Sequence, residues 1–175
     1  MFQPVTRLFH STFSSPFGPI TLVASDAALV RLEFGTSVPR IAGTEIIANS
    51  EKTSVYERQL NEYLAGKRRY FDLRLDLRGT EFQRLCWQAL FRIPYGETRS
   101  YAELARMVGR PRACRAVGAA NGSNPIAIIV PCHRVIASDG TLGGYGGGLP
   151  AKRWLLELEQ RHTPGRGTQS ALAFR

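Results

Sequence analysis

SYAELARMVGRPRACRAVGAAN, residues 100–121, is the stretch that decides the fold of the C-terminal half of this chain. Ser100 and Glu103 have the spacing of a capping box, which begins a helix. Apolar residues at helical spacing follow, and Gly109 can end this first helix. Pro111 can occupy the first position of a second helix, which continues through ACRAVGAAN. Two short helices around a tight turn predict a helix-turn-helix.

The second of these helices presents mainly small side chains. They are Ala113, Ala116, Gly118, Ala119 and Ala120. Small side chains allow a helix backbone to approach either a neighbouring part of the protein or a DNA duplex. Composition leaves both interpretations open, and the arginines around the helix favour DNA.

Basic residues are concentrated in the same half of the chain. The whole sequence of 175 residues has a formal net charge of +9. Residues 1–78 hold ten basic and eight acidic side chains, whereas residues 79–175 hold thirteen and six. Between Leu104 and Ser138 no acid occurs among the arginines Arg106, Arg110, Arg112, Arg115 and Arg134. Nucleic acid is the natural partner of such a stretch, although a solvated basic face would have the same composition.

The first 78 residues predict a small α+β domain. PITLVAS and LVRLEF are typical of two strands, and the turn-like residues 25–27 between them predict a hairpin. Apolar residues alternate with charged ones again over residues 71–77, as in a strand with one wet face. Residues 36–50 are predicted to be a loop.

Two further helices are marked by capping signals. SVYERQLNEYLAG is predicted to begin with a capping box of Ser54 and Glu57 and to end at Gly66. Thr80 and Gln83 repeat the capping-box spacing. The apolar stripe that follows consists of Phe82, Leu85, Cys86, Ala89 and Leu90, which makes Cys86 a core residue.

Cysteine usage indicates a reducing compartment. The three cysteines, Cys86, Cys114 and Cys132, are odd in number and widely spaced, which argues against a disulfide framework. No Cys/His cluster has zinc-ligand spacing, so we expect no metal and no cofactor. No apolar run approaches the ~20 residues needed to span a bilayer, and no secretory signal is evident. We expect a soluble, cytoplasmic protein with no membrane partner.

The most informative segment for chemistry is NGSNPIAIIVPCHRVIASDGTLGGYGGGLP, residues 121–150. IAIIV is predicted to be a buried strand, and Val130 before Pro131 favours an extended backbone. Cys132 and His133 follow directly. Adjacent side chains of an extended segment point to opposite faces, so proton transfer between these two needs a bend or a bridging water. By itself, such a pair is weak evidence for catalysis.

The last predicted helix carries a carboxylate at the edge of its apolar face. The apolar residues are Ala151, Trp154, Leu155 and Leu158. Glu159 lies about 40° around the helix from Leu155, whereas Glu157 should face water. Glu159 is therefore either an inward-pointing carboxylate near a site or a rim residue in a surface salt bridge.

PCHRV, with RAVGAANGSNP before it and GGYGGG after it, resembles the O6-alkylguanine-DNA alkyltransferase family. The resemblance extends from about Gly79 to Glu159, includes IPYGETRSYAELA and KRWLLELE, and is weaker earlier in the chain. It implies a ribonuclease-H-like domain over residues 1–78. It also implies a mostly helical DNA-binding and active-site domain over residues 79–175. The short, polar tail from about His162 contains Gly and Pro, and its composition predicts that it is flexible.

The resemblance assigns roles to four residues at the centre of the reaction. Cys132 matches the alkyl acceptor, and His133 and Glu159 match the relay that activates it through a water. Asn124 matches the asparagine that ties the DNA-binding helix to the active-site turn.

Further residues are implied to hold the duplex and the flipped base. Arg115 matches the side chain inserted where the base leaves, and Tyr101 matches the tyrosine beside it that reaches guanine. The helix that carries Arg115 would enter the minor groove on Ala113, Ala116 and Ala119. The base pocket would be formed by Tyr145, Gly146 and the backbone of Cys132 and Val135. Gly146 replaces a serine of some relatives, which leaves the tolerance for larger alkyl groups open.

The function implied by the resemblance is direct-reversal repair of duplex DNA that contains O6-alkylguanine, with O4-alkylthymine as a possible second lesion. A thioether on Cys132 has no easy leaving group, so each molecule is expected to react once. We expect a monomer, with cooperative binding along DNA left open. The alternatives are a non-catalytic damage sensor or helix-turn-helix regulator, and a cysteine hydrolase using Cys132 and His133. Such sensors replace the acceptor cysteine, which is present here.

Overall fold

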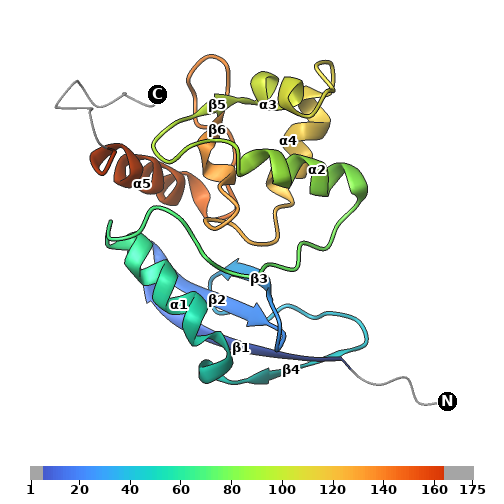
Figure 1. The fold of residues 1–175 in the computed structure, drawn as a ribbon, viewed down its shortest axis with the longest axis vertical. Coiled ribbons are helices and arrows are strands. Elements are labelled where there is room, and N and C mark those ends of the chain that lie inside the picture. Colours follow the sequence, from blue (N-terminus) through green and yellow to red (C-terminus); the bar gives the residue numbers. More distant parts are fainter. Residues whose placement is uncertain (1–5, 164–175) are drawn as a thin grey trace. The chain divides into compact units, whose positions relative to one another are not determined.

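The computed structural model describes residues 6–163 and divides the chain into two compact units (Figure 1). The first unit ends at Arg78, and the second begins at Gly79. Within the described range, no helix is long and apolar enough to cross a membrane. The tail that the sequence predicts to be flexible continues beyond Thr163, and from there on it lies outside the described residues.

The first unit contains a four-stranded sheet in the order β3-β2-β1-β4. Its strands are β1 (Thr6–Ser15), β2 (Gly18–Ala24), β3 (Leu29–Phe34) and β4 (Thr44–Ala48). The predicted hairpin is confirmed, because β2 and β3 pair antiparallel around a short turn. β1 pairs antiparallel with β2 and parallel with β4, so the first strand occupies the interior of the sheet.

The prediction of a loop over residues 36–50 is wrong, because this range contains β4 and the first residue of the next helix. β4 is only five residues long, TEIIA, and has no clear alternation of apolar and polar side chains. Its partner is β1, more than 30 residues earlier in the chain. A short strand whose pairing is non-local leaves little trace in its own sequence.

Helix α1 (Ser50–Leu64) begins four residues earlier than predicted. Asn49 is its N-cap, and the Asn49 side chain accepts a hydrogen bond from the backbone of Lys52. The predicted capping box at Ser54 is therefore wrong, whereas the predicted stop is confirmed by the left-handed backbone of Gly66, with φ of 71°. α1 lies along one face of the sheet, against β1 and β2 (Figure 1).

Residues 71–77 do not form the strand that their alternation suggests. Their only ladder contact is a single bridge between Leu75 and Leu29. Instead, the buried amide of Gln59 binds the backbone of Asp72 twice, as donor and as acceptor, with both bonds at 3.0 Å. A side chain of α1 thus takes the place of a neighbouring strand.

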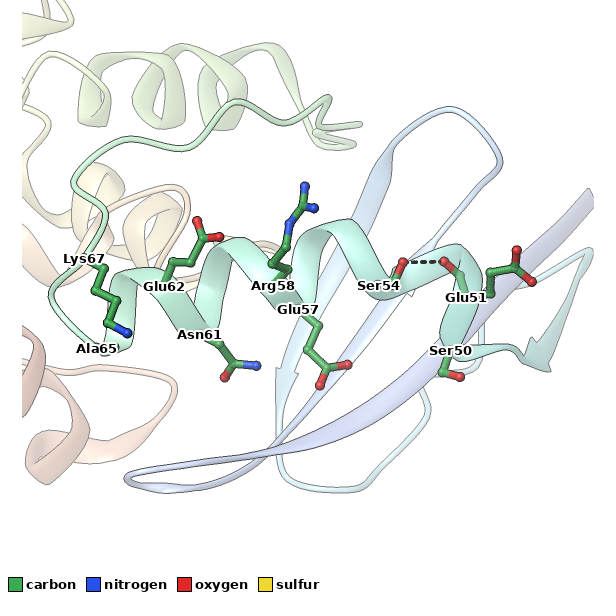
Figure 2. A pocket seen from close by; sticks show the side chains of 9 residues that line it. All are labelled: Ser50, Glu51, Ser54, Glu57, Arg58, Asn61, Glu62, Ala65 and Lys67. Atoms are coloured by element: carbon green, nitrogen blue, oxygen red, sulfur yellow. Dashed lines mark hydrogen bonds between the residues drawn. The ribbon is translucent and has the colours of Figure 1, made fainter.

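A groove follows the outward-facing side of α1 (Figure 2). Polar and charged side chains from one helix and the turn after it line the groove, among them Glu57, Arg58, Asn61 and Lys67. None of the site residues predicted from the sequence lies in it.

The second unit is mostly helical (Figure 1). Its elements are α2 (Glu81–Leu90), β5 (Arg99–Ser100), α3 (Tyr101–Met107), α4 (Cys114–Gly122), the 3₁₀ turn η1 (Cys132–Arg134), β6 (Val135–Ile136) and α5 (Gly148–Arg161). The capping boxes that begin α2 and α3 are both present as predicted, with reciprocal side-chain and backbone bonds.

Helices α3 and α4 form the predicted helix-turn-helix, and Gly109 in the turn between them has a φ of 69°. α4 begins at Cys114 rather than at Pro111, because residues 111–112 are still part of the turn. α2 packs against α4 through Trp87, whose indole N–H donates to the carbonyl of Ala120 at 2.8 Å.

The apolar stripe predicted for α2 is wrong in one position. Leu85 is 39% exposed, whereas Trp87 is buried. Cys86 is fully buried, which confirms its prediction as a core residue.

The segment IAIIV is buried as predicted but is a turn rather than a strand. Ile129 N–H donates to the carbonyl of Ala127 across Ile128, whose φ of 73° is rare for a β-branched residue. The Asn124 amide donates to Val130 O at 2.8 Å and accepts from Ile126 N at 3.0 Å. These side-chain bonds satisfy backbone groups that a strand would pair with a neighbour.

Candidate active site

The turn that carries Cys132 and His133 is helical rather than extended, contrary to the sequence-based expectation. Cys132, His133 and Arg134 form η1, with Arg134 N–H donating to the carbonyl of Pro131 at 3.1 Å. A 3₁₀ helix has three residues per turn, so neighbouring side chains are about 120° apart. The thiol and the imidazole therefore still diverge, and the expected need for a bridge between them stands.

The His133 imidazole pairs with Glu159 in the interior of the second unit. Nε2 of His133 lies 2.8 Å from Oε1 of Glu159, and both side chains are fully buried. The other Glu159 oxygen accepts from the backbone N–H of Gly96 at 2.8 Å. Glu159 is thus an inward-pointing carboxylate, which rules out the rim salt bridge considered for it.

Arg134 was counted among the arginines available to a polyanion, and for this residue that interpretation is wrong. Its guanidinium is almost fully buried and binds both Glu159 oxygens, at 2.9–3.1 Å. It also donates to the carbonyl of Ile93 at 2.7 Å. Arg134 is committed to the interior, where its planar fork fits a carboxylate.

This arrangement keeps Glu159 charged and His133 neutral. Burial by itself would raise the pKa of Glu159, but the interactions with His133 and Arg134 outweigh it and lower that pKa to about 2. Burial lowers the pKa of His133, against the opposing attraction of Glu159. At neutral pH the imidazole is therefore a base, oriented by a carboxylate that remains ionised.

The Cys132 thiol is buried, with 5% of the residue exposed. Burial raises its pKa to about 11, although the Asn124 side chain and the charge of Lys152 act in the opposite direction. In the resting protein the thiol is therefore protonated. Its conversion to a nucleophile requires a base, and His133 is the adjacent one.

Lys152 is a site residue that the sequence reasoning missed. It is fully buried in α5, and its ammonium donates to the carbonyls of Val135 at 2.7 Å, Gly144 at 3.4 Å and Leu142. Burial lowers its pKa to about 8, and negative charge at Cys132 opposes this. Its position seven residues before Glu159, two helical turns away, was the available signal.

A parallel pairing brings Tyr101 close to η1. β5 ends directly before α3, and β6 begins directly after η1. Because β5 pairs with β6, the N-terminus of α3 lies near η1. Burial raises the pKa of Tyr101, and negative charge at Cys132 raises it further, which reflects their proximity. The Tyr101 hydroxyl approaches Gly143, where an added Cβ would lie 2.9 Å from it.

The predicted pocket residues surround the same turn in part. Val135 is fully buried, and the Tyr145 ring stands edge-on to the His133 ring with centroids 6.4 Å apart. Burial raises the pKa of Tyr145 well above its ordinary value. Gly146, in the same glycine-rich loop, is exposed.

Helix α4 divides its small residues between two surfaces. Arg115, Ala116 and Ala119 are exposed, and Ala113 is half-exposed. Ala120 is buried against α2, and Gly118 lies against the Tyr101 ring. The packing interpretation is therefore confirmed for Gly118 and Ala120, whereas the approach to DNA by the exposed side of the helix stays a prediction.

Comparison with known proteins gives matches along both units. The family model described as 6-O-methylguanine DNA methyltransferase, ribonuclease-like domain, matches residues 8–77. The model described as the DNA-binding domain of the same family matches residues 81–161.

Individual relatives align with most of the chain. A methylated-DNA–protein-cysteine methyltransferase of Mycolicibacterium paratuberculosis is 51% identical over 89% of this chain and 94% of its own length. One of Methanosarcina barkeri is 48% identical over 89% and 99%. A crystal structure of Mycobacterium tuberculosis OGT in complex with DNA has 50% identity and a TM-score of 0.82, covering 91% of this chain and 96% of that one.

Proposed function

This chain belongs to the 6-O-methylguanine DNA methyltransferase family, and we propose that it transfers the alkyl group of O6-alkylguanine in duplex DNA to its own Cys132. The observation that carries the proposal is the buried Cys132 thiol beside a buried His133–Glu159 pair, in the unit that also contains the helix-turn-helix. The chain is a cytoplasmic monomer in this proposal and meets its substrate on the chromosome.

The exposed side of α4 is the DNA-binding surface in this proposal. Ala116 and Ala119 allow close approach to the minor groove, and Arg115 enters the stack where the target base leaves. The O6-alkyl carbon is inside the base stack, so the nucleotide must be flipped out at a cost of a few kcal/mol. The DNA complex of the similar Mycobacterium tuberculosis protein supports DNA binding.

The transfer is a direct displacement at the alkyl carbon. His133 takes the thiol proton through a bridging water. Glu159 holds the imidazole in place, and Arg134 in turn holds the Glu159 carboxylate. The sulfur forms a bond to the alkyl carbon as the bond from that carbon to O6 breaks, and the electron pair moves into guanine. The proton that left the thiol ends on guanine, with Tyr101 stabilising the departing base.

The product is a thioether on Cys132 and an unmodified guanine. A thioether carbon has no good leaving group, so the protein reacts once. Neither a cofactor nor a metal takes part in this balance. Glu159 has two roles in this proposal, since it orients the base of the reaction and neutralises Arg134.

The test is to mix the protein with excess duplex that contains one O6-methylguanine, and to measure intact mass and map the modified peptide. We expect one added methyl group at Cys132 and repair that stops at one equivalent. Cys132→Ser is the control, and it should bind the duplex without a change in mass.

Two other results would overturn the proposal. Binding of the lesion by the unsubstituted protein without any mass change would indicate a damage sensor. Product formation beyond one equivalent would indicate an enzyme that turns over, such as a cysteine hydrolase.

A further inference from the structure

The turn between α2 and β5 lies beside the His133–Glu159 pair and contributes no side chain to the proposed reaction. It spans residues 94–97, and the N–H of Glu97 donates to the carbonyl of Pro94 at 3.1 Å. Gly96, the third residue of the turn, has a φ of 78°. This hydrogen bond and a positive φ at the third residue are typical of a type II turn, and glycine adopts that backbone without strain.

The type of this turn decides where the Gly96 N–H points. Type I and type II turns differ in the peptide unit between their second and third residues, which is rotated by roughly 180° from one type to the other. In the orientation that the turn has here, the Gly96 N–H donates to Oε2 of Glu159 at 2.8 Å. The opposite orientation would turn this N–H away from the carboxylate and bring the carbonyl of Tyr95 towards it.

The Glu159 carboxylate needs such a contact to present one particular oxygen to His133. The last torsion of a Glu side chain is soft, so burial by itself does not fix the plane of the carboxylate. Nε2 of His133 lies 2.8 Å from Oε1, whereas the Gly96 N–H binds Oε2. Arg134 binds both oxygens and does not distinguish between them. The Gly96 N–H does distinguish them, from a position fixed by the backbone.

The surroundings of Gly96 leave no room for a side chain. Gly96 is buried, and an added Cβ would overlap the hydroxyl of Thr163 and lie 3.3 Å from the carbonyl oxygen of Glu159. The Thr163 hydroxyl donates to that same carbonyl at 2.7 Å. Gly43, in the first unit, also has a positive φ, of 69°, but the space around its Cβ position is open. A turn alone therefore explains Gly43, whereas Gly96 is also packed against the residue that supplies the carboxylate.

We propose that Gly96 is a positioning residue for the alkyl transfer, and that its N–H holds the Glu159 carboxylate with Oε1 facing Nε2 of His133. The inference rests on the proposed function and deepens it. The ionised carboxylate accepts the Nε2 proton, so the lone pair of Nδ1 receives the proton of the thiol. Rotation of the carboxylate would remove the partner that selects this tautomer. Gly96 acts through Glu159 and supplies no group to the transfer itself.

Gly96→Ala tests this role, because alanine disfavours the left-handed backbone and its methyl group would meet Thr163. With saturating O6-methylguanine duplex, we expect the single-turnover rate constant for methylation of Cys132 to fall by about 10- to 100-fold, as for loss of one charge-assisted hydrogen bond. Gly43→Ala is the matched control, because it places alanine at a similar φ in open surroundings. It should react at the unsubstituted rate.

A general loss of structure would also slow the reaction, so a second measurement reports on the imidazole itself. Nitrogen NMR of protein with isotopically labelled histidine distinguishes an imidazole protonated at Nε2 from one protonated at Nδ1. Without DNA, the unsubstituted protein and Gly43→Ala should show His133 protonated at Nε2, and Gly96→Ala should show a mixture of the two tautomers. A slowed Gly96→Ala protein that keeps the Nε2 tautomer would overturn the proposal, and so would an unchanged rate.

A third measurement needs no variant and remains decisive if Gly96→Ala does not fold. The Gly96 amide of the unsubstituted protein should exchange its hydrogen slowly, as buried and hydrogen-bonded amides do. Rapid exchange at this amide would overturn the proposal. Failure of the proposed function gives a different result, because the O6-methylguanine duplex would then not methylate Cys132 of the unsubstituted protein, whereas the NMR and exchange measurements use no DNA.

Discussion

The two units of this chain bury different kinds of polar side chain. In the first unit the buried polar residues are Thr21, Thr53 and Gln59, all of them neutral. In the second unit they are Asn121, His133, Arg134, Lys152 and Glu159. Every buried polar residue of the described range that can carry a full charge thus lies in the second unit.

This difference indicates that the first unit supports the fold, whereas the second unit holds the groups that react. Neutral groups such as Gln59 are satisfied by backbone partners and help to hold the first unit together. Buried charges are a poor way to gain stability, because desolvation offsets most of their attraction. Their concentration around Cys132 is explained by a reaction that needs an oriented base and a fixed cation beside a thiol.

The largest expected effect comes from neutralising the buried carboxylate. Glu159→Gln leaves Arg134 in the interior without a counter-charge, so we expect the free energy of unfolding to fall by about 3–5 kcal/mol. Urea denaturation measures this. Glu157→Gln, two residues earlier on the exposed side of α5, should change stability by less than about 0.5 kcal/mol. Similar losses for the two variants would mean that burial of charge does not distinguish this site.

The contribution of the same carboxylate to the free energy of unfolding should be lost in acid. The pKa of Glu159 is about 2 in the folded protein against an ordinary 4.5, so protons bind the unfolded state first. The contribution of Glu159, on the order of 3 kcal/mol, is present above pH 4.5 and is lost as pH falls towards 2. Urea denaturation at a series of pH values should show this loss. Glu157→Gln should retain it, whereas a Glu159→Gln protein with an unchanged acid slope would contradict the assignment.

Lys152→Met tests whether the buried cation serves the reaction. The variant removes the ammonium that binds three backbone carbonyls and favours the Cys132 thiolate. Loss of one charge-assisted interaction of this kind should slow methyl transfer by about 10- to 100-fold. Lys67→Met, at an exposed lysine of the first unit, should react at the unsubstituted rate.

The pH dependence of the Lys152→Met effect provides a further check. Lys152 has a pKa of about 8, so its charge is present below that pH and lost above it. The ratio of the unsubstituted rate to the Lys152→Met rate should therefore decline as pH rises through about 8. A ratio that is constant from pH 6.5 to 9.5 would show that the charge of Lys152 is not what matters.

The smallest effect is expected in the first unit. Gln59→Leu removes both bonds to the backbone of Asp72, so stability should fall by about 1–2 kcal/mol while the methyl-transfer rate of the folded protein stays unchanged. Differential scanning calorimetry and single-turnover kinetics measure the two quantities. A slowed reaction in this variant would break the division between a supporting and a reactive unit.

Local signals were sufficient for several elements of the fold. The capping boxes of α2 and α3, the β2–β3 hairpin and the glycine after α1 each depend on residues within a few positions of one another. β4 and residues 71–77 were misassigned because their partners, β1 and Gln59, are distant in the sequence.

The candidate site divides in the same way. Cys132 and His133 could be named from PCHRV, and Glu159 could be named from its position on the last predicted helix. Both signals depend only on residues that are close together in the sequence. Arg134 was assigned to the wrong partner, since charge in a sequence does not reveal whether a side chain faces solvent or a buried carboxylate.

By itself, the sequence determined which helices form, where the basic residues gather and which cysteine lies in the PCHRV motif, because these depend on neighbouring residues and composition. Tertiary structure alone decided that Arg134 and Lys152 are internal and that the Tyr101 hydroxyl approaches Gly143. It also decided that the backbone around Ile128 turns rather than extends. The physical reason is that burial, desolvation and hydrogen-bond satisfaction are properties of groups brought together from distant positions, and no window of sequence contains them all.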